Sequence, residues 1–389
     1  MRFHARMQAA QTLGLQRLSI SCRIVGNLRR MRKGYLCVKG STGLGRQPMK
    51  RSRVGFAAGI AGLVALVTFV TSTQSAVIAQ GTHAAVKPPV IKLRWSQEFT
   101  GAAGIPNFVQ TRSAVAGKHV WAAEVNGLGG GNYERQYYTD GAVSLNANGT
   151  VAHNAIELNG QGQLAINAAK TPSTFGSAPG STPGTADNVN CWYGRCKYQS
   201  GRINTLGLVG FKYGRLEARI KIPSGIGTWP AWWMMGANQP TVGWPKCGEL
   251  DIMEAAMSSG WAYSAFGTMH SFPDNGIGLS RTIYPDKLYT AYHTYGLQWD
   301  ATKIIWSFDG KPFFTLTKAS ATSAANAVDG VRRSWPFDQE MYMILNTAIG
   351  GRLGGDSSFN APPNATGGTM LVDWIHFSSV DGVGSVIIH

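Results

Sequence analysis

Residues Gly214-Arg-Leu-Glu-Ala-Arg-Ile-Lys-Ile222 place an apolar side chain at every second position from Leu216 onward, with charged side chains between them. This alternation has the period of a β-strand that turns one face to a core and the other to solvent. The segments Lys303-Ile-Ile-Trp-Ser-Phe-Asp-Gly310 and Ile91–Phe99 show similar β-branched and aromatic character between turn residues. The sequence therefore predicts strands in all three segments.

The rest of the chain also favours an all-β fold. After residue 90 no long segment has a sustained helical apolar period, apart from a weak Ala-rich piece at Ala319–Val328. We expect one domain at residues 91–378, built as a β-jelly-roll sandwich of two antiparallel sheets, with a tail at 379–389. The stretch Thr171–Asn190, rich in Ser, Thr, Pro and Gly, is predicted to be a long surface loop.

The charge distribution limits the classes of partner. The formal charge is +16, but residues 1–79 contain 13 Lys or Arg and no Asp or Glu. The remainder has 23 basic and 20 acidic residues, a balance unlike that of a nucleic-acid-binding domain. We expect no nucleic-acid partner, unless residues 1–48 persist in the mature protein and bind nucleic acid or anionic lipid.

Residues 49–79 have the order of a secretory signal peptide. Met49-Lys-Arg-Ser-Arg53 is basic, Val54–Val70 is apolar, and small or polar residues follow up to Ala79. We expect cleavage after Ala79, a linker at 80–90 and an extracellular protein without stable membrane insertion. An uncleaved anchor is the alternative, because the apolar run is close to the minimum for a membrane span. Residues 1–48 are interpreted as a start-site artefact.

Five cysteines are present, of which Cys22 and Cys37 lie in the basic leader. Cys191 and Cys196 are close enough to close a small disulfide loop in an oxidising compartment. Cys247 is then unpaired, and we expect it to be buried. A metal site is disfavoured, because no His or second Cys pair has matching spacing.

The segment Cys247-Gly-Glu-Leu-Asp-Ile-Met-Glu254 carries three acids in an apolar, strand-like setting. Uncompensated charge is costly to bury, so such a cluster typically marks a cleft in which carboxylates perform chemistry. Strand geometry puts Glu249 and Asp251 on one face and Glu254 on the other. A β-bulge at Ile252 or the residue after it would bring Glu254 to the same face.

With this bulge, the Cα atoms of Glu249 and Glu254 would lie about 13 Å apart, four steps of about 3.3 Å. Inclined side chains would bring the carboxylates to about 5–6 Å, the spacing of a retaining glycosidase. Asp251 would hydrogen-bond Glu249, and its charge would help to keep Glu254 protonated. For the three acids alone, a solvated acidic strand or a cation site is the alternative.

Glu249-Leu-Asp-Ile-Met-Glu254 resembles the active-site strand of glycoside hydrolase family 16, in the bulged form of its laminarinase branch. Further blocks, in the family's order, extend the resemblance over residues 91–378. They are Trp95-Ser-Gln-Glu-Phe99, Gly131-Asn-Tyr-Glu-Arg-Gln-Tyr-Tyr-Thr139, Ser200-Gly-Arg-Ile-Asn-Thr205, Tyr213-Gly-Arg-Leu-Glu-Ala-Arg-Ile-Lys221, Trp229-Pro-Ala-Trp-Trp233, His293-Thr-Tyr-Gly-Leu-Gln-Trp299, Ile344-Leu-Asn-Thr-Ala-Ile-Gly-Gly351 and Met370-Leu-Val-Asp-Trp374.

The resemblance implies a concanavalin A-like sandwich with an open concave cleft, and a secreted, retaining endo-β-1,3-glucanase acting on laminarin-type β-glucan. It implies Glu249 as nucleophile, Asp251 as its helper and Glu254 as acid/base, with no cofactor required for catalysis. We expect a monomer. The substrate-binding side chains implied are Asn132 and Arg202 at glycone hydroxyls, Trp229 and Trp233 as an apolar floor, and His270 near the acid/base.

Some family members hold a structural calcium ion partly through acids that match Glu98 and Asp373, so a calcium site is a further expectation. The chain also departs from the family pattern, because Arg352-Leu-Gly-Gly-Asp356 stands where laminarinases commonly have Asn-Trp-Pro-Gly. This removes an aromatic residue from the expected cleft edge.

The rival hypothesis is a non-catalytic β-glucan-binding protein, and retention of both glutamates argues against it. Action on mixed-linkage glucan or galactan, or transglycosylation, is the alternative within the family, since the fold alone does not fix the substrate.

Overall fold

The structure, a computed structural model, describes residues 87–110, 119–145, 151–171, 190–257, 264–274, 276, 278–285, 288–323, 330–356, 358–361 and 364–389. These residues belong to one structural unit, residues 83–389. The leader, the signal-like segment, most of the linker and nearly all of the predicted loop at 171–190 lie outside the described residues. Among the described residues, no helix is long and apolar enough to cross a membrane.

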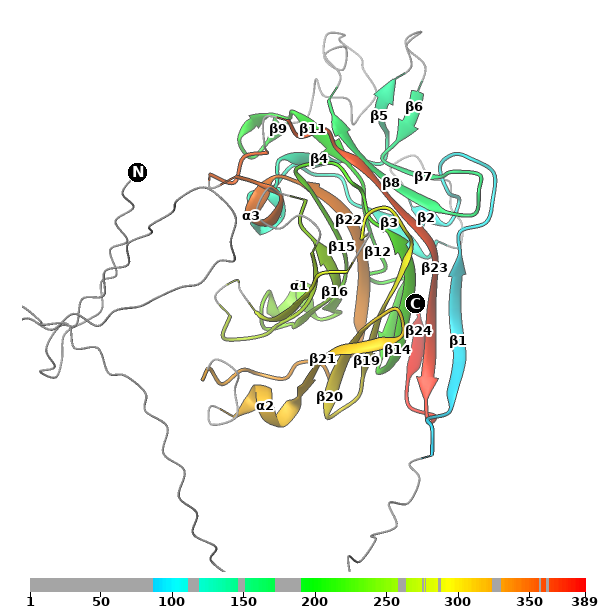
Figure 1. The fold of residues 1–389 in the computed structure, drawn as a ribbon, viewed down its shortest axis with the longest axis vertical. Helices are drawn as coiled ribbons and strands as arrows, with labels where there is room; N and C mark the ends of the chain where they lie inside the picture. Colours follow the sequence, from blue (N-terminus) through cyan, green and yellow to red (C-terminus); the bar gives the residue numbers. More distant parts are fainter. Residues whose placement is uncertain are drawn as a thin grey trace, which may run out of the picture. The chain divides into compact units, whose positions relative to one another are not determined.

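Two ten-stranded sheets form the domain (Figure 1). The first sheet has the strand order β21-β20-β19-β14-β23-β8-β11-β4, with β1 paired to β23 and β7 to β8. Its strands are β1 (Ile91–Glu98), β4 (Gln136–Tyr138), β7 (Ile156–Leu158), β8 (Leu164–Lys170), β11 (Tyr198–Ser200), β14 (Gly214–Lys221), β19 (His293–Trp299), β20 (Lys303–Phe308), β21 (Lys311–Thr317) and β23 (Gly368–Val380).

The second sheet has the order β18-β17-β16-β15-β22-β12-β3-β2, and β13 pairs with both β22 and β24. Its strands are β2 (Val109–Gln110), β3 (Trp121–Ala123), β12 (Arg202–Asn204), β13 (Val209–Lys212), β15 (Thr228–Gly236), β16 (Glu249–Ala255), β17 (Ala265–His270), β18 (Leu279–Ile283), β22 (Met341–Ile349) and β24 (Ser385–Ile388).

Smaller elements complete the described part. Two hairpins pair β5 (Ala142–Leu145) with β6 (Val151–Asn154), and β9 (Asn190–Cys191) with β10 (Gly194–Arg195). The helices are α1 (Gln239–Val242), α2 (Lys318–Thr322), α3 (Gly351–Gly354) and a 3-10 turn at Gly129–Gly131. The Ala-rich piece expected near 319–328 is helical only over α2 where it is described.

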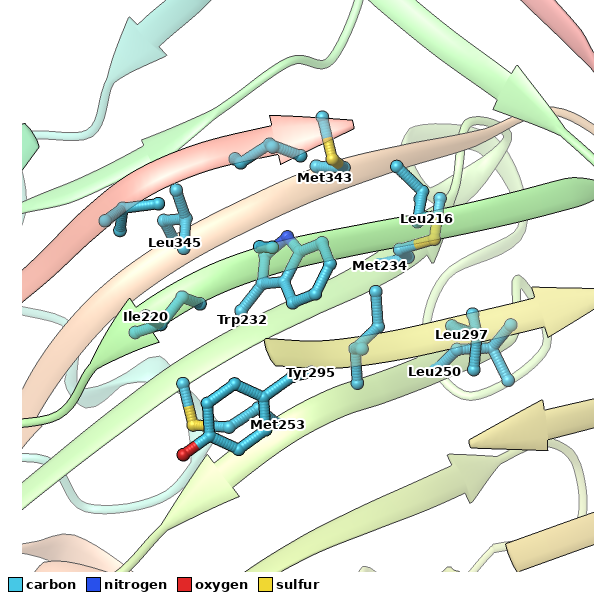
Figure 2. Close-up of a cluster of buried hydrophobic side chains, with 14 of the residues drawn as sticks. Leu216, Ile220, Trp232, Met234, Leu250, Met253, Tyr295, Leu297, Met343 and Leu345 are labelled. Carbon is cyan, nitrogen blue, oxygen red and sulfur yellow. The ribbon is translucent and has the colours of Figure 1, made fainter. Parts of the chain in front are cut away.

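The core lies between the sheets and explains the alternation in the sequence. On β14, Leu216 and Ile220 are fully buried, and they share one apolar cluster with Trp232 and Met234 of β15 (Figure 2). Removing such side chains from water is the main stabilising contribution to a fold of this kind. The three segments predicted as strands are confirmed as β1, β14 and β20.

The prediction of two antiparallel sheets holds for most strand pairs, but each sheet also contains a parallel pair. β4 runs parallel to β11, and β2 runs parallel to β3. The segment 379–389, expected as a tail, is part of the fold. β24 pairs antiparallel with β13, and the amide of Asp381 donates to the Val90 carbonyl at 2.8 Å. Apolar Val386 packs against the core, which accounts for the association of the segment with the sheet.

Candidate active site

A β-bulge on β16 places three carboxylates on one face of the second sheet. Asp251 pairs with Thr268 of β17, whereas Glu254 pairs with Phe266, so three steps on β16 match two on β17. Leu250 and Met253 therefore point into the core, and the acids point away from it. The predicted bulge is confirmed.

The acids line a cavity on this face. Its other walls come from β12, β15, β22 and the segment that follows the 3-10 turn. The lining residues are Gly130, Asn132, Glu134, Arg202, Trp229, Ala231, Trp233, Glu249, Asp251, Glu254 and Asn346. Besides Asp251, the cavity brings together six of the residues predicted to bind substrate or to act in catalysis. The seventh, His270, does not line the cavity.

Backbone geometry explains how β16 begins. Gly248 has a φ of +78°, and a Cβ at this position would lie 2.5 Å from Pro336. Glycine alone adopts such a backbone at so close an approach without strain. The residue before Glu249 therefore fixes where the first carboxylate enters the cavity.

Each glutamate receives a hydrogen bond from an indole. Trp229 Nε1 donates to Glu254 Oε1 at 2.9 Å, and Trp244 Nε1 donates to Glu249 Oε2. Trp244 is 42% exposed, and the Glu249 carboxylate beside it is half-buried. These bonds orient both carboxylates, and each favours the ionised form of its acceptor.

His270 lies beside Asp251 and opposite Glu249 on β17, and it does not line the cavity. Its Nε2 is 3.4 Å from Asp251 Oδ2, and its Nδ1 is 3.0 Å from Asp274 Oδ2. Burial lowers the pKa of His270, but hydrogen bonds with Asp251 and Asp274 and the charge of Glu249 raise it to about 11. The side chain is therefore an imidazolium at neutral pH, and it holds Asp251 in place.

The two glutamates hold protons more firmly than exposed carboxyls. Burial and the charge of Asp251 raise the pKa of Glu249 to about 8, and the same causes raise the pKa of Glu254 well above its ordinary value. The His270 charge and the indole bonds act in the opposite direction on both. Neighbouring carboxyls share their protons, so the cluster is suited to keep one acid protonated while another is ionised.

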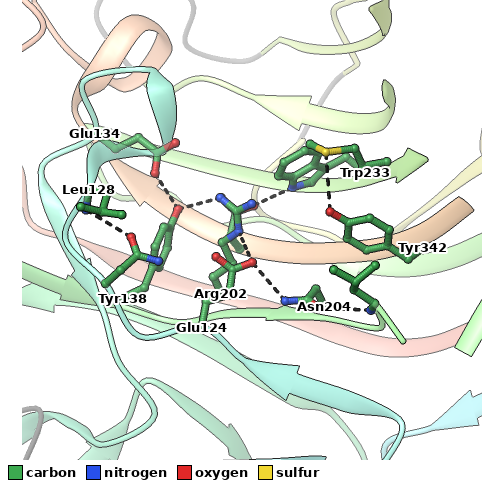
Figure 3. Close-up of polar contacts among 12 residues, drawn as sticks. Glu124, Leu128, Glu134, Tyr138, Arg202, Asn204, Trp233 and Tyr342 are labelled. Carbon is green, nitrogen blue, oxygen red and sulfur yellow. Dashed lines mark hydrogen bonds and ion pairs between the residues drawn. The ribbon is translucent and has the colours of Figure 1, made fainter. Parts of the chain in front are cut away.

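Arg202 is the centre of a polar network at one side of the cavity (Figure 3). Its Nε lies 3.0 Å from Glu124 Oε1, and its guanidinium carbon lies 4.9 Å from the Trp233 ring centroid. Trp233 Nε1 donates to Asn346 Oδ1 at 2.7 Å. These contacts hold the guanidinium and the indole in fixed positions in the cavity wall.

Glu134 joins this network from the segment after the 3-10 turn. The hydroxyl of Tyr138 donates to Glu134 Oε2 at 2.8 Å, and Gln136 Nε2 donates to the same atom at 2.6 Å. Burial and the charge of Glu134 raise the pKa of Tyr138, so the hydroxyl stays protonated. Asn132, two residues before Glu134, lines the cavity beside it.

The sequence reasoning did not single out Glu134, Trp244, Asp274 or Asn346. Glu134 and Asn346 lie inside the quoted sequence blocks, so inspection of every polar residue in those blocks could have found them. Trp244 and Asp274 lie in loops beside β16 and β17, and no spacing rule links them to the acids.

Glu98 and Asp373 do not meet around a common cation site. His376 Nε2 lies 2.7 Å from Glu98 Oε1, and Asp373 pairs with Arg219. The described residues contain no group of three or more His, Cys, Asp or Glu placed to hold a metal ion. The arrangement does not favour calcium here, and calcium binding stays a prediction.

The cysteine predictions are confirmed. Cys191 and Cys196 form a disulfide with a Cα–Cα distance of 5.1 Å, and Cys247 is free and buried. Burial raises the pKa of the Cys247 thiol to about 11, so it stays protonated and takes no part in the chemistry of the cavity.

The chain is similar to known proteins in both sequence and structure. Residues 146–376 match the family described as glycosyl hydrolases family 16. The chain is 31% identical over 301 residues to a beta-glucanase of Rhodothermus marinus, covering 76% of this chain and 87% of that protein. It is 31% identical over 283 residues to glucan endo-1,3-beta-glucosidase A1 of Niallia circulans, covering 68% of this chain and 38% of that protein. The catalytic domain of a laminarinase from Thermotoga petrophila superposes with a TM-score of 0.56 at 27% identity. The superposition covers 75% of this chain and 99% of that domain.

Proposed function

Because the chain belongs to glycosyl hydrolase family 16, we propose that it hydrolyses internal β-1,3-glucosidic bonds of a β-glucan with retention of configuration. The observation that carries the proposal is the bulged strand β16, which turns Glu249, Asp251 and Glu254 to one cavity. The similar proteins named above as glucanases support β-glucan as the substrate.

The first chemical step uses both glutamates. The Glu249 carboxylate attacks the anomeric carbon while Glu254 transfers its proton to the leaving glycosidic oxygen, so a covalent glycosyl-enzyme forms and the glycosidic bond breaks. Burial and the charge of Asp251 raise the pKa of both glutamates, so this step uses the form of the cluster in which Glu249 is ionised and Glu254 keeps its proton.

The second step reverses these roles. Glu254, now ionised, takes a proton from a water molecule whose oxygen attacks the anomeric carbon, and Glu249 departs as a carboxylate. A sugar hydroxyl in place of that water would give transglycosylation. Asp251 and the His270 imidazolium act through both glutamates: the Asp251 charge favours the protonated form of each, and the His270 charge favours the ionised form of each.

Substrate binding combines apolar and polar surfaces. Trp229 and Trp233 lie on the same face of β15, four positions apart with Ala231 between them on that face, whereas Trp232 belongs to the core. Their rings suit the C–H faces of a pyranose, and Arg202 and Asn132 supply polar groups for its hydroxyls. We propose that these four residues bind the sugar units around the cleaved bond.

The decisive experiment incubates the purified chain with laminarin, lichenan, agarose and xyloglucan and follows the first products by NMR. Early release of β-configured laminari-oligosaccharides is the expected result. Inverted products would overturn the retaining mechanism. Laminarin binding without cleavage of any polymer would favour the non-catalytic glucan-binding alternative.

Two sets of variants separate chemistry from binding. Glu249→Gln and Glu254→Gln should abolish hydrolysis while retaining laminarin binding, because each loses only transition-state chemistry. Azide should rescue Glu254→Ala with formation of a β-glycosyl azide, whereas near-normal turnover in either glutamine variant would defeat the assignment.

Export and assembly are further parts of the proposal. N-terminal sequencing of the secreted protein should find a start near Gln80. A mature protein that keeps residues 1–48 would instead reopen the nucleic-acid and lipid hypotheses. A monomer is expected in light scattering.

A further inference from the structure

A group of aromatic side chains gathers at the rim of the cavity. We propose that Tyr133, Trp192, Phe359 and Arg352, here called the rim platform, bind sugar units of the same glucan chain that lie beyond the units held in the cavity. The inference rests on the proposed function and adds a second contact surface for long substrates.

The platform unites three segments that are far apart in the sequence. The Tyr133 and Phe359 rings stack with centroids 4.9 Å apart and planes 7° apart, and Trp192 meets Tyr133 edge-on at 5.7 Å. The Arg352 guanidinium carbon lies 5.6 Å from the Tyr133 ring centroid. Tyr133 is 43% and Trp192 44% exposed and Phe359 is half-buried, so the first two rings supply most of the aromatic surface that faces solvent. An exposed aromatic patch of this kind typically marks a binding surface.

The rim platform is continuous with the cavity. Tyr133 stands between Asn132 and Glu134, which both line the cavity. Trp192 Nε1 donates to the Glu134 carbonyl at 2.8 Å, and the Arg352 amide donates to the Asn132 carbonyl at 3.0 Å. A polymer that leaves the cavity on this side therefore meets the platform next.

Several contacts hold Trp192 in place before any ligand binds. The Cys191–Cys196 disulfide closes the β9–β10 hairpin that carries it, and its amide donates to the Gly127 carbonyl at 2.9 Å. The Arg135 guanidinium carbon lies 4.6 Å from the Trp192 ring centroid. A Cβ at Gly129, whose φ is +77°, would lie 2.6 Å from the indole. A ring ordered in advance loses little entropy on binding.

The chemistry of the platform fits a neutral polysaccharide. Flat aromatic faces accept the apolar C–H face of a glucose unit, and exposed Arg352 offers donors to its hydroxyls. Arg352 contacts both stacked rings, since its guanidinium carbon also lies 5.8 Å from the Phe359 ring centroid. Tyr133, Trp192 and Phe359 supply aromatic surface from other parts of the chain.

The test compares Trp192→Ala and Tyr133→Leu with a matched control, Trp374→Ala. Trp374 is half-buried on β23 of the other sheet, where it stacks on His376. We expect kcat/KM on laminarin to fall about tenfold in the two platform variants, and kcat/KM on the shortest cleaved laminari-oligosaccharide to stay unchanged. The control should match the unmodified protein on both substrates.

Affinity electrophoresis in laminarin separates this inference from the proposed function. Reduced retardation of the platform variants, with an unchanged melting temperature, supports the platform even if the chain cleaves no glucan. Equal retardation of all proteins overturns the platform while leaving hydrolysis in the cavity intact. Equal losses on short and long substrates would also overturn it, because they would show a purely structural role. Tyr133→Leu decides the question if Trp192→Ala does not fold.

Discussion

Replacement of His270 by Asn tests the electrostatics of the carboxylate cluster. The imidazolium contacts Asp251 at 3.4 Å and stands opposite Glu249 in the pairing of β16 with β17. Its charge lowers the pKa of Glu249, which must be ionised to attack the anomeric carbon. Removing the charge raises that pKa, so a larger fraction of Glu249 stays protonated at a given pH.

The magnitude follows from the cross-strand geometry. The Cβ atoms of paired residues lie about 5 Å apart, and two unit charges at that distance interact by about 3 kcal/mol at an effective dielectric constant of about 20. One pH unit corresponds to about 1.4 kcal/mol. The acidic limb of the profile should therefore move to higher pH by up to about two units.

The assay is kcat/KM on laminarin as a function of pH, which reports the ionisations of the free enzyme. Asp274→Asn is the matched control. It keeps the imidazole of His270 and replaces only the carboxylate that lies 3.0 Å from its Nδ1 with a neutral amide. Its acidic limb should shift less than that of His270→Asn. An unshifted acidic limb in a folded His270→Asn protein would refute this electrostatic reasoning.

Further outcomes follow from single contacts. Trp244→Phe removes the indole donor to Glu249 and keeps an aromatic ring, so kcat/KM should fall about tenfold; unchanged kinetics would show that the bond has no role. Trp232→Ala should lower the free energy of unfolding by about 3–5 kcal/mol in urea titrations, since Trp232 is fully buried between the sheets. A loss under about 1 kcal/mol would contradict this packing. If calcium binds at Glu98 and Asp373, it should raise the melting temperature and EDTA should reverse the gain; identical melting curves would contradict the calcium prediction.

The catalytic strand is the part of the site that the sequence predicts best. The order Glu249, Asp251 and Glu254 conflicts with strict alternation, and the conflict itself indicates a bulge at Ile252 or Met253. Apolar Leu250 and Met253 then take the core positions. These are local constraints, because the side-chain direction on a strand depends only on position along it.

The partners of these acids could not be predicted in the same way. Trp244 reaches Glu249 from the loop before β16, and Asp274 reaches His270 from the loop after β17. The paths of such loops depend on packing against the rest of the domain rather than on residue spacing. The parallel pairs β2–β3 and β4–β11 and the docking of β24 are likewise consequences of long-range contacts.

The sequence by itself therefore determined the all-β class, the family resemblance and the three acids on a bulged strand, because side-chain periodicity and motif order are encoded locally. The tertiary structure alone decided which groups surround those acids. It placed an imidazolium beside Asp251, an indole donor on each glutamate and the rim platform beside the cavity. The physical reason is that these contacts join strands and loops from distant segments, and only the packing of the whole domain brings them within a few ångströms.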